Sequence, residues 1–362
     1  MKRKPTVRIL ILPLLLAFLL LLPLLSAAVI AEHRYERSHP AYLKHALLRV
    51  LGEEQEEAEE LPTGAQSGRL TVLVVGKDKT AGLTDVMMLA SLDTEQHSLQ
   101  LLQIPRDTYA AYTEREYKKI NGAYARLGGE GLSDFLEQSL GVTVDRYVCV
   151  DLEVLGDMVD RLGGVRMNVP IDMDYDDPDQ NLHIHIKAGE QVLDGQTAQS
   201  FVRYRSGYAL ADVGRMDAQK LFLSALAKQA KESLSVAQTV SLVCGSFGKI
   251  KTDMTLNDCI ACAKQLRSIS LSNWYMATLP GASARTGGNS GAWYYVLNRD
   301  ATASLVARTM GADGPFDPNG VFNDEGRASF DRIYRAPASS VALHEYTAQG
   351  ALDGEIAVRR VG

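Results

Sequence analysis

The chain has 362 residues, of which 46% are hydrophobic, and a formal net charge of −6 at pH 7. This apolar content supports a sizeable core and excludes a disordered protein. The acidic balance argues against a general nucleic-acid binder, because such proteins need a basic surface to neutralise phosphates. We therefore expect no nucleic-acid partner, and any anion site must be local.

The N-terminus has the charge pattern of a membrane anchor. Residues 1–8 read MKRKPTVR, and the run from Ile9 to Ala31 contains no charged side chain. At about 1.5 Å per residue, this run can cross a hydrocarbon layer of about 30 Å. The basic start predicts a cytoplasmic segment 1–8, a single-pass transmembrane signal anchor 9–31 and an extracellular remainder at the cell membrane. A cleaved signal peptide is the alternative, because SAAVIA offers small residues for cleavage.

An acidic stretch follows the expected anchor. Six glutamates fall within residues 53–60, and Pro, Gly and Ser come after them. This composition is typical of a solvated spacer. We predict an extracellular linker over residues 32–68 and a folded part that begins at Arg69.

Strand and helix patterns alternate through the folded part. Short β-rich runs predict strands, and apolar residues at helical spacing that stop at glycine predict helices. In chain order the expected elements are strands 70–76, 85–93 and 97–105, helices 119–129 and 131–141, strand 145–151, helix 152–163, strand 165–170, an excursion over 172–195 that ends in a hairpin, helices 196–207, 211–234 and 256–269, and an edge strand 273–281.

The alternation of elements indicates the fold class. It predicts an α/β fold with a mixed central β-sheet that is covered by helices on both faces, in an α/β/α arrangement. No polar linker interrupts residues 69–297, so we expect one domain there. The apolar periodicity fades beyond this point, and we interpret residues 298–362 as a C-terminal appendage.

Charged side chains gather where the expected elements begin or end, which is where ligand groups are usually mounted. In QIPRDTY, Pro105 ends strand pairing and turns the chain outward, so Arg106 and Asp107 lie at a strand exit. The other members of this group are Asp78, Asp85, Arg203, Arg205, Asp212 and Arg215. Arginine forks suit phosphate and paired carboxylates suit a hard divalent cation, so a pyrophosphate ligand would use both. Each residue alone is also compatible with a surface charge.

Two further motifs contain metal-binding residue types. His183 and His185 share one face of a strand in HIHI, but no third ligand lies at metal spacing. Cys259 and Cys262 form C-x-x-C within the expected helix 256–269, without a second ligand pair. We interpret both motifs as structural, with a metal site as the alternative. The GG pairs are interpreted as turns and not as a P-loop, because no Lys-Ser/Thr follows them.

Seven motifs in one order resemble those of a known family, the LytR-CpsA-Psr proteins of bacterial cell walls. They are VVGKD, TDVMML, IPRDTY, KINGAYARLGG, DRYVCVDLEVLGDMVDRLGGV, DGQTAQSFVRYR and ADVGRMDAQ. The resemblance covers about Leu70 to Ala230 and is weaker as far as TLPG. An N-terminal anchor with an extracellular domain is also that family's arrangement.

The resemblance implies a phosphotransferase that attaches an anionic glycopolymer, such as wall teichoic acid or capsule, to peptidoglycan. The implied partners are a glycan donor linked to polyprenyl pyrophosphate, a peptidoglycan acceptor and the bacterial membrane. Apolar stretches such as VLGDMVDRLGGV could line a tunnel for the lipid, with ordinary core as the alternative. The implied cofactor is Mg²⁺, with Mn²⁺ as another ion that would serve.

Site residues carry over position by position. The resemblance implies that Asp85 and Asp107 hold the metal, and that the pyrophosphate is gripped by Arg106, Arg203, Arg205 and Arg215. Lys119, Asn121 and Gln219 match further substrate-binding positions, and Asp78 matches a position of less certain role. Asp107 or Asp212 could accept the proton of the attacking hydroxyl.

The chain departs from the family pattern at a few positions. Leu83-Thr84 stands where Arg-Ser is common, Val86 replaces a usual threonine, and Ala218 replaces a second arginine of the long helix. The loss of two guanidinium groups would weaken the grip on an anion or shift the preferred polymer.

Two functions of other kinds are the alternatives. A membrane-anchored binding module would hold an anionic wall polymer through its arginines and would need no carboxylate pair. A lipid pyrophosphate hydrolase would use water in place of the sugar hydroxyl and would differ only in its acceptor.

Overall fold

The computed structural model describes residues 68–77, 84–110, 119–178, 182–210, 212–285, 292–312, 327–356 and 358. These residues belong to one compact unit, 60–362. None of the helices in these ranges is long and apolar enough to span a bilayer. The expected cytoplasmic segment 1–8, the expected anchor 9–31 and the expected linker up to residue 67 lie outside the described residues.

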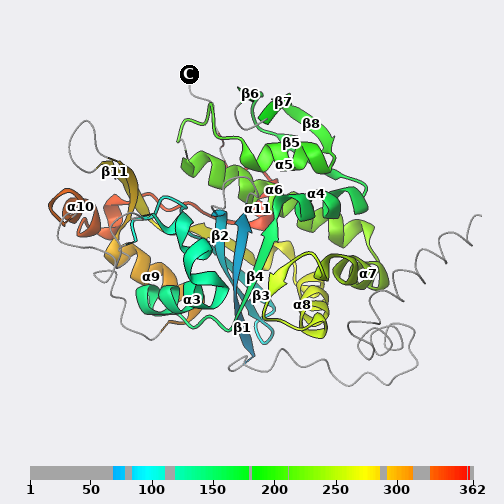
Figure 1. Cartoon of the computed structure of the whole chain (residues 1–362), viewed down its shortest axis with the longest axis horizontal. Helices are drawn as coiled ribbons and strands as arrows, with labels where there is room; N and C mark the ends of the chain where they lie inside the picture. The colour runs from blue at the N-terminus through cyan, green and yellow to red at the C-terminus, as the bar shows by residue number, and fades with distance from the viewer. Residues whose placement is uncertain are drawn as a thin grey trace, which may run out of the picture. The chain divides into compact units, whose positions relative to one another are not determined.

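A seven-stranded mixed sheet forms the centre of the fold (Figure 1). Its strand order is β13-β10-β3-β2-β1-β4-β9. The strands are β1 (Arg69–Lys77), β2 (Thr84–Asp93), β3 (Ser98–Gln103), β4 (Arg146–Asp151), β9 (Lys251–Thr252), β10 (Trp274–Thr278) and β13 (Glu345–Thr347). β2 is antiparallel to both β1 and β3, whereas β4 runs parallel to β1 and β10 runs parallel to β3. The mixed sheet confirms the expected fold class.

Helices cover both faces of the sheet because its strands are apolar on both sides. Successive side chains of a strand point to opposite faces, so Leu102 joins the core on one side of β3 and Leu101 the core on the other. The first core includes α3 (Ala123–Leu140) and α9 (Arg299–Met310), and the second includes α6 (Asp212–Ser233) and α11 (Ala348–Leu352). Figure 1 shows α3 and α9 on one side of the sheet, with α7 (Val236–Phe247) and α8 (Leu256–Ser268) on the other.

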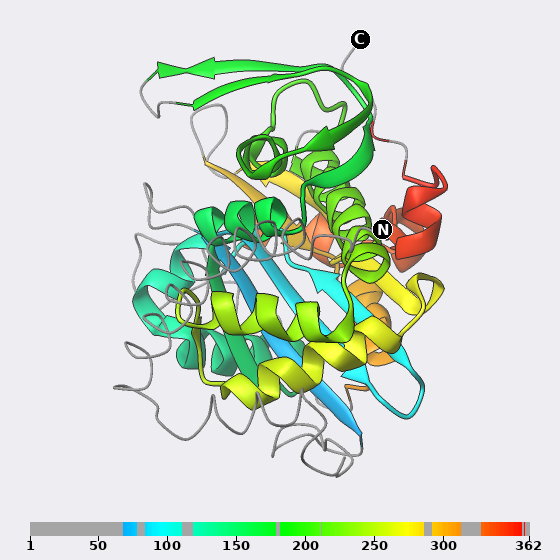
Figure 2. The same ribbon diagram turned by 90° about the vertical axis from the view of Figure 1, so that its right-hand side faces the viewer.

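A second, smaller layer is built from residues 152–225. It contains α4 (Leu152–Arg161), α5 (Gly195–Arg203) and two antiparallel strand pairs that pack around a third core. The pairs are β5 (Val165–Val169) with β8 (Gly189–Leu193), and β6 (Met173–Asp177) with β7 (Leu182–Ile186). Figure 2 shows the β6–β7 hairpin as a long green ribbon at the top of the molecule. The expected excursion over 172–195 therefore contains this hairpin as well as β8.

Glycines set the ends of several elements. The helical patterns 119–129 and 131–141 merge into α3, which is broken at Gly128, where φ is +70°. Gly163 and Gly164 also have positive φ and end the segment after α4, as expected for a GG turn. The predicted helix 196–207 is too long, because α5 stops at Arg203 and Gly207, with φ +82°, lies in the turn beyond it.

The C-terminal part of the chain corrects two sequence expectations. β10 is not an edge strand, because β13 pairs with it and takes the edge. Residues 298–362 are not an appendage, since β13 completes the sheet and Phe330 packs in the same core as α3. The strand pair β11 (Gly281–Arg285) with β12 (Trp293–Leu297), and the helix α10 (Arg327–Tyr334), extend this side of the fold.

Candidate functional site

Several of the sequence-predicted charges meet at the edge of the sheet that is formed by strand ends. β1, β3, β4 and β10 run in the same direction, so their carboxyl ends lie at this edge, and β2 begins there. Ligands of open α/β sheets usually bind at such an edge. At its β1–β4 end, Lys77 Nζ lies 3.2 Å from Asp151 Oδ1. Sequence reasoning missed this pair because its members are far apart in the chain.

The IPRDTY loop places Arg106 against Asp85. The Ile104 N–H donates to the Met87 carbonyl at 2.8 Å, which continues the β2–β3 pairing past the end of β3. Continuing this register by two residues brings Arg106 opposite Asp85. The Arg106 Nη1 to Asp85 Oδ1 distance is 2.6 Å, so the arginine and aspartate that lie 21 residues apart form a charge-assisted hydrogen bond.

Arg215 joins this pair from the first turn of α6. Its Nη2 lies 2.7 Å from Asp212 Oδ1, and its Nη1 lies 3.8 Å from Asp85 Oδ1. Burial lowers the pKa of Arg215, whose side chain is only 2% exposed; Asp212 and Asp85 oppose this effect, whereas Arg106 and Arg205 add to it. Two arginines and two aspartates thus form one electrostatic unit, with Arg205 close enough to act on it.

Lys119 and Asn121 contact the IPRDTY loop at Asp107 and Arg106. Lys119 Nζ is 3.0 Å from Asp107 Oδ1 and 5.8 Å from the centre of the Tyr294 ring. The Asn121 backbone N–H donates to the Arg106 carbonyl at 3.1 Å. These contacts join the KIN motif to the PRD motif.

The remaining predicted residues are placed differently. Arg203 is the last residue of α5, and Arg205 is exposed in the turn that follows. Gln219 is buried below the edge, where its side chain accepts from Gln103 Nε2 at 2.7 Å and donates to the Val202 carbonyl at 3.0 Å. Gln219 therefore ties β3 to α5, and no described charge of the cluster contacts it. Asp78 lies outside the described residues.

Three donors in this region are buried without a hydrogen-bond partner among the residues that the structure describes. They are Nε of Arg106, Nε of Arg215 and the Tyr208 hydroxyl. Buried polar groups in proteins nearly always have a hydrogen-bond partner, so donors that lack an acceptor beside a charge cluster indicate a binding place for an anion. Sequence reasoning missed Tyr208, although it lies in the same RYRSGY segment as Arg203 and Arg205.

Two substituted family positions have local explanations. The Thr84 hydroxyl is buried and donates to the Asn121 carbonyl at 3.1 Å. Ala218 packs in the core that includes α5 residues such as Phe201. Thr84 thus supports the KIN segment, and an arginine at 218 would not fit without repacking this core.

The carboxylates of the charged cluster are candidate ligands for a metal ion. No group of three or more His, Cys, Asp or Glu side chains in the described ranges stands ready to hold a metal ion. Asp85 pairs with Arg106 and Asp107 pairs with Lys119, and both carboxylate side chains are partly exposed. Mg²⁺ is commonly bound by one or two carboxylates together with water and phosphate oxygens, so these two carboxylates are of the ligand type that this ion takes.

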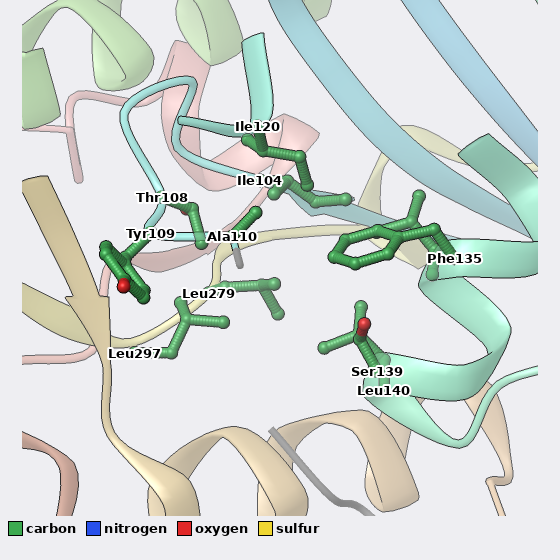
Figure 3. A pocket seen from close by; sticks show the side chains of 11 residues that line it. Ile104, Thr108, Tyr109, Ala110, Ile120, Phe135, Ser139, Leu140, Leu279 and Leu297 are labelled. Atoms are coloured by element: carbon green, nitrogen blue, oxygen red, sulfur yellow. The ribbon is translucent and has the colours of Figure 1, made fainter. Parts of the chain in front are cut away.

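An apolar pocket begins one residue after Asp107. It is lined by Ile104, Thr108, Tyr109, Ala110, Ile120, Phe135, Leu136, Ser139, Leu140, Leu279 and Leu297, from the loop, α3 and the β10–β12 region (Figure 3). The pocket is narrow, since the volume in which a water molecule fits is about 20 Å³. Its lining contains none of the VLGDMVDRLGGV stretch that could have lined a tunnel, and Val154, Val159 and Val165 are core residues.

The four cysteines are free, and we predict that they react slowly. Burial raises the pKa of Cys259 and of Cys262 to about 12, with a smaller contribution from the charge of Asp258. Burial also raises the pKa of Cys149 and Cys244. The thiolate is the reactive form, so at pH 8 we expect the C-x-x-C thiols to react with a disulfide reagent roughly a thousandfold more slowly than free cysteine. Fast reaction of either thiol before denaturant is added would contradict this.

Known proteins are similar to this chain in sequence. Residues 44–310 match the LytR_cpsA_psr family. The chain is 30% identical over 184 residues to the polyisoprenyl-teichoic acid–peptidoglycan teichoic acid transferase TagV of Bacillus subtilis, a match that covers 50% of this chain and 47% of TagV. It is 28% identical over 252 residues to TagU of Bacillus mycoides, which carries the same enzyme name, over 67% of this chain and 80% of TagU.

Solved structures share the fold. The crystal structure of B. subtilis TagV superposes with a TM-score of 0.58 at 22% identity and covers 68% of this chain and 98% of that one. A structure described as TagT bound to LIIa-WTA superposes with a TM-score of 0.55 at 24% identity, over 72% of this chain and 98% of TagT. The mixed α/β architecture is therefore that of these proteins.

Proposed function

Because the chain belongs to the LytR_cpsA_psr family, we propose that it is a transferase that moves an anionic glycopolymer from a polyprenyl pyrophosphate carrier to peptidoglycan. The curated relatives are named teichoic acid transferases, and the match to TagV spans about half of that protein's length. The polymer class we propose is wall teichoic acid or a similar anionic glycan. We further propose the membrane anchor 9–31, with residues 69 onward outside the cell, since the donor's lipid lies in the membrane.

One observation carries the proposal: the charged cluster and the apolar pocket share a single loop. Arg106 and Asp107 belong to the cluster, and Thr108, Tyr109 and Ala110 line the pocket. A ligand with a pyrophosphate head and an isoprenoid tail has this same order of charge and apolar surface. The pocket would have to widen for the tail, which requires side chains of α3 such as Phe135 to move.

A change of ion-pair partners would free cationic side chains of the cluster to bind the donor. Asp85 and Asp107 are paired with Arg106 and Lys119, so a divalent cation on the two carboxylates would release both cationic side chains toward phosphate oxygens. When bound, Mg²⁺ supplies positive charge that offsets the charge of the pyrophosphate. Arg203 ends α5, the charge of Arg205 just beyond it acts on Arg215, and Arg215 is held in place by Asp212.

The transfer step follows from this arrangement. A peptidoglycan hydroxyl oxygen forms a bond to the phosphorus nearer the glycan, and the bond from that phosphorus to the bridging oxygen breaks. The bridging oxygen leaves with polyprenyl phosphate, and a phosphodiester joins the glycan to peptidoglycan. With Asp107 assigned to the metal, Asp212 is the carboxylate that accepts the hydroxyl proton. Catalysis is then mainly positioning and charge stabilisation by the arginines.

The decisive experiment incubates the full chain in detergent micelles with a polyprenyl-pyrophosphate-linked glycan, peptidoglycan and Mg²⁺. Mass spectrometry should find glycan phosphate covalently attached to peptidoglycan, with one polyprenyl phosphate released for each transfer. Release of free glycan phosphate without attachment would overturn transfer in favour of the hydrolase. Donor retention without any bond cleavage would leave the binding module.

Substitution of Arg106 tests the arginine grip. Lysine keeps the charge but lacks the guanidinium fork, so we expect Arg106→Lys to raise the KM for the donor by about tenfold or more, and Arg106→Ala to raise it further. Arg299→Ala is the matched control, since Arg299 is an exposed residue of α9 that pairs with Asp300. An unchanged KM in both Arg106 variants would remove this residue from the donor site.

A further inference from the structure

Tyr208 carries a hydroxyl group to which the proposed function gives no role. The side chain is 2% exposed, and its oxygen has no hydrogen-bond partner in the described part of the chain. A phenolic hydroxyl in water donates and accepts hydrogen bonds, so its burial without a partner costs free energy. Because native proteins leave few buried groups in this state, the Tyr208 hydroxyl requires a specific explanation.

Close packing fixes the position of the Tyr208 ring. The Tyr204 and Tyr208 rings meet edge to face, with centroids 5.4 Å apart and an angle of 84° between their planes. Tyr208 also packs on Gly214 in the first turn of α6, where an added Cβ atom would lie only 2.7 Å from the Tyr208 Cβ. The hydroxyl oxygen therefore stays where this packing places it, and only its hydrogen is free to rotate.

This packing brings Tyr208 to the charged cluster. Gly214 directly precedes Arg215, and the charge of Arg215 acts on the Tyr208 hydroxyl. The charge of Arg106 acts in turn on Arg215, and the Nε atoms of both arginines are also buried without an acceptor among the described residues. A pyrophosphate group offers several charged acceptor oxygens at once, so it suits such a set of donors.

The Tyr208 hydroxyl is a neutral donor. Burial raises the pKa of Tyr208, and the charge of Arg215 offsets only part of this rise. The group is therefore protonated at neutral pH, so it can donate a hydrogen bond but cannot serve as a base. Unlike the arginines, it adds no charge to the cluster.

We infer, on the basis of the proposed function, that the Tyr208 hydroxyl donates a hydrogen bond to a pyrophosphate oxygen of the glycan donor. Tyr208 is then a substrate-binding residue beside Arg106 and Arg215. The hydroxyl gains its acceptor only when the glycan donor binds, so its burial weakens folding while its hydrogen bond strengthens binding. A residue whose role is only structural would not have these opposite effects.

The test uses Tyr208→Phe, which removes the oxygen and keeps the ring that packs on Tyr204. The full chain in detergent micelles is titrated with inorganic pyrophosphate in the presence of Mg²⁺ and followed by calorimetry, and its kinetics with the lipid-linked glycan donor are measured in parallel. We expect the variant to bind pyrophosphate about tenfold more weakly and to have a KM raised by a similar factor, with kcat retained. In urea it should unfold at a higher concentration than the natural chain, because the unpartnered hydroxyl is gone.

Tyr275→Phe is the matched control, because the Tyr275 hydroxyl of β10 donates to the Glu345 carboxylate. This variant should unfold at a lower urea concentration and bind pyrophosphate as the natural chain does. Unchanged pyrophosphate affinity in Tyr208→Phe would overturn the inference, as would a natural chain that does not bind pyrophosphate. Earlier unfolding of Tyr208→Phe would also overturn it, since the hydroxyl would then have a partner within the protein. Pyrophosphate binding that depends on Tyr208 in a chain without transfer would count against the proposed function alone.

Discussion

Replacement of Asp107 by alanine is expected to reduce glycopolymer transfer at least about a thousandfold while the protein still folds. Asp107 is partly exposed, and its Oδ1 lies 3.0 Å from Lys119 Nζ. Its loss would remove one of two carboxylates that we assign to the metal, and with it the charge that offsets the pyrophosphate. Transfer should be measured against Mg²⁺ concentration, and high Mg²⁺ should not restore the variant.

The companion variants make this prediction sharper. Asp85→Ala should resemble Asp107→Ala, and the double variant should be little worse than either, because the two carboxylates act as a unit. Asp157→Ala is the matched control, since Asp157 is an exposed carboxylate of α4 that pairs with Lys249. Full activity in Asp107→Ala would remove the catalytic assignment and favour the binding module.

Replacement of Asp217 by alanine is expected to lower the free energy of unfolding by about 3–5 kcal/mol, because it breaks a buried ion pair. The exposed fractions of Lys220 and Asp217 are 1% and 4%, and Lys220 Nζ lies 2.8 Å from Asp217 Oδ1. His344 Nδ1 lies 3.2 Å from the other carboxylate oxygen. Without Asp217, the Lys220 ammonium would be buried with no anion beside it. Urea unfolding of Asp217→Ala and of the natural chain measures the difference.

A second substitution separates the charge from the lost contacts. Lys220→Met in the Asp217→Ala background removes the uncompensated ammonium, so the double variant should be more stable than Asp217→Ala alone. Asp300→Ala, which breaks the exposed pair with Arg299, should leave the unfolding transition in place. If Asp217→Ala unfolds at the same urea concentration as the natural chain, Lys220 does not depend on this carboxylate.

The pH dependence of the same pair has a defined direction. Burial raises the pKa of Asp217. The hydrogen bond from His344 and the charge of Lys220 lower this pKa by a larger amount, so the net shift is downward. A carboxyl group with a lowered folded-state pKa contributes stability above its unfolded pKa of about 3.9 and loses it as pH falls through the folded value. The gap in stability between the natural chain and Asp217→Ala should therefore narrow in acid.

The sequence predicted the first half of the fold well because its signals there are local. Strand alternation and glycine stops identified β1 to β3, and the alternation of strands with helices identified the mixed sheet. It missed α7, although Ser235 and Gln238 form a capping box, because the helix is rich in β-branched residues. β13 could not be found, since three residues have no periodicity and pair only with the distant β10.

The sequence indicated which charged residues belong to the candidate site, but not which of them contact one another. The motifs assigned four residues to one anion site, and the structure connects them by ion pairs. They are Asp85, Arg106, Asp212 and Arg215. The burial of Gln219 and the place of Tyr208 depend on how α5 and α6 pack, which no short motif encodes.

β13 is the last strand of the main sheet to be synthesised. The edge of the main sheet is closed by residues 345–347, which the ribosome makes after every other strand of that sheet. During synthesis, the outer side of β10 would lack its neighbour until this late segment emerges, and an open strand edge is a template for association with other chains. A nascent chain that stalls before residue 345 should therefore be more dependent on chaperones than one released at full length.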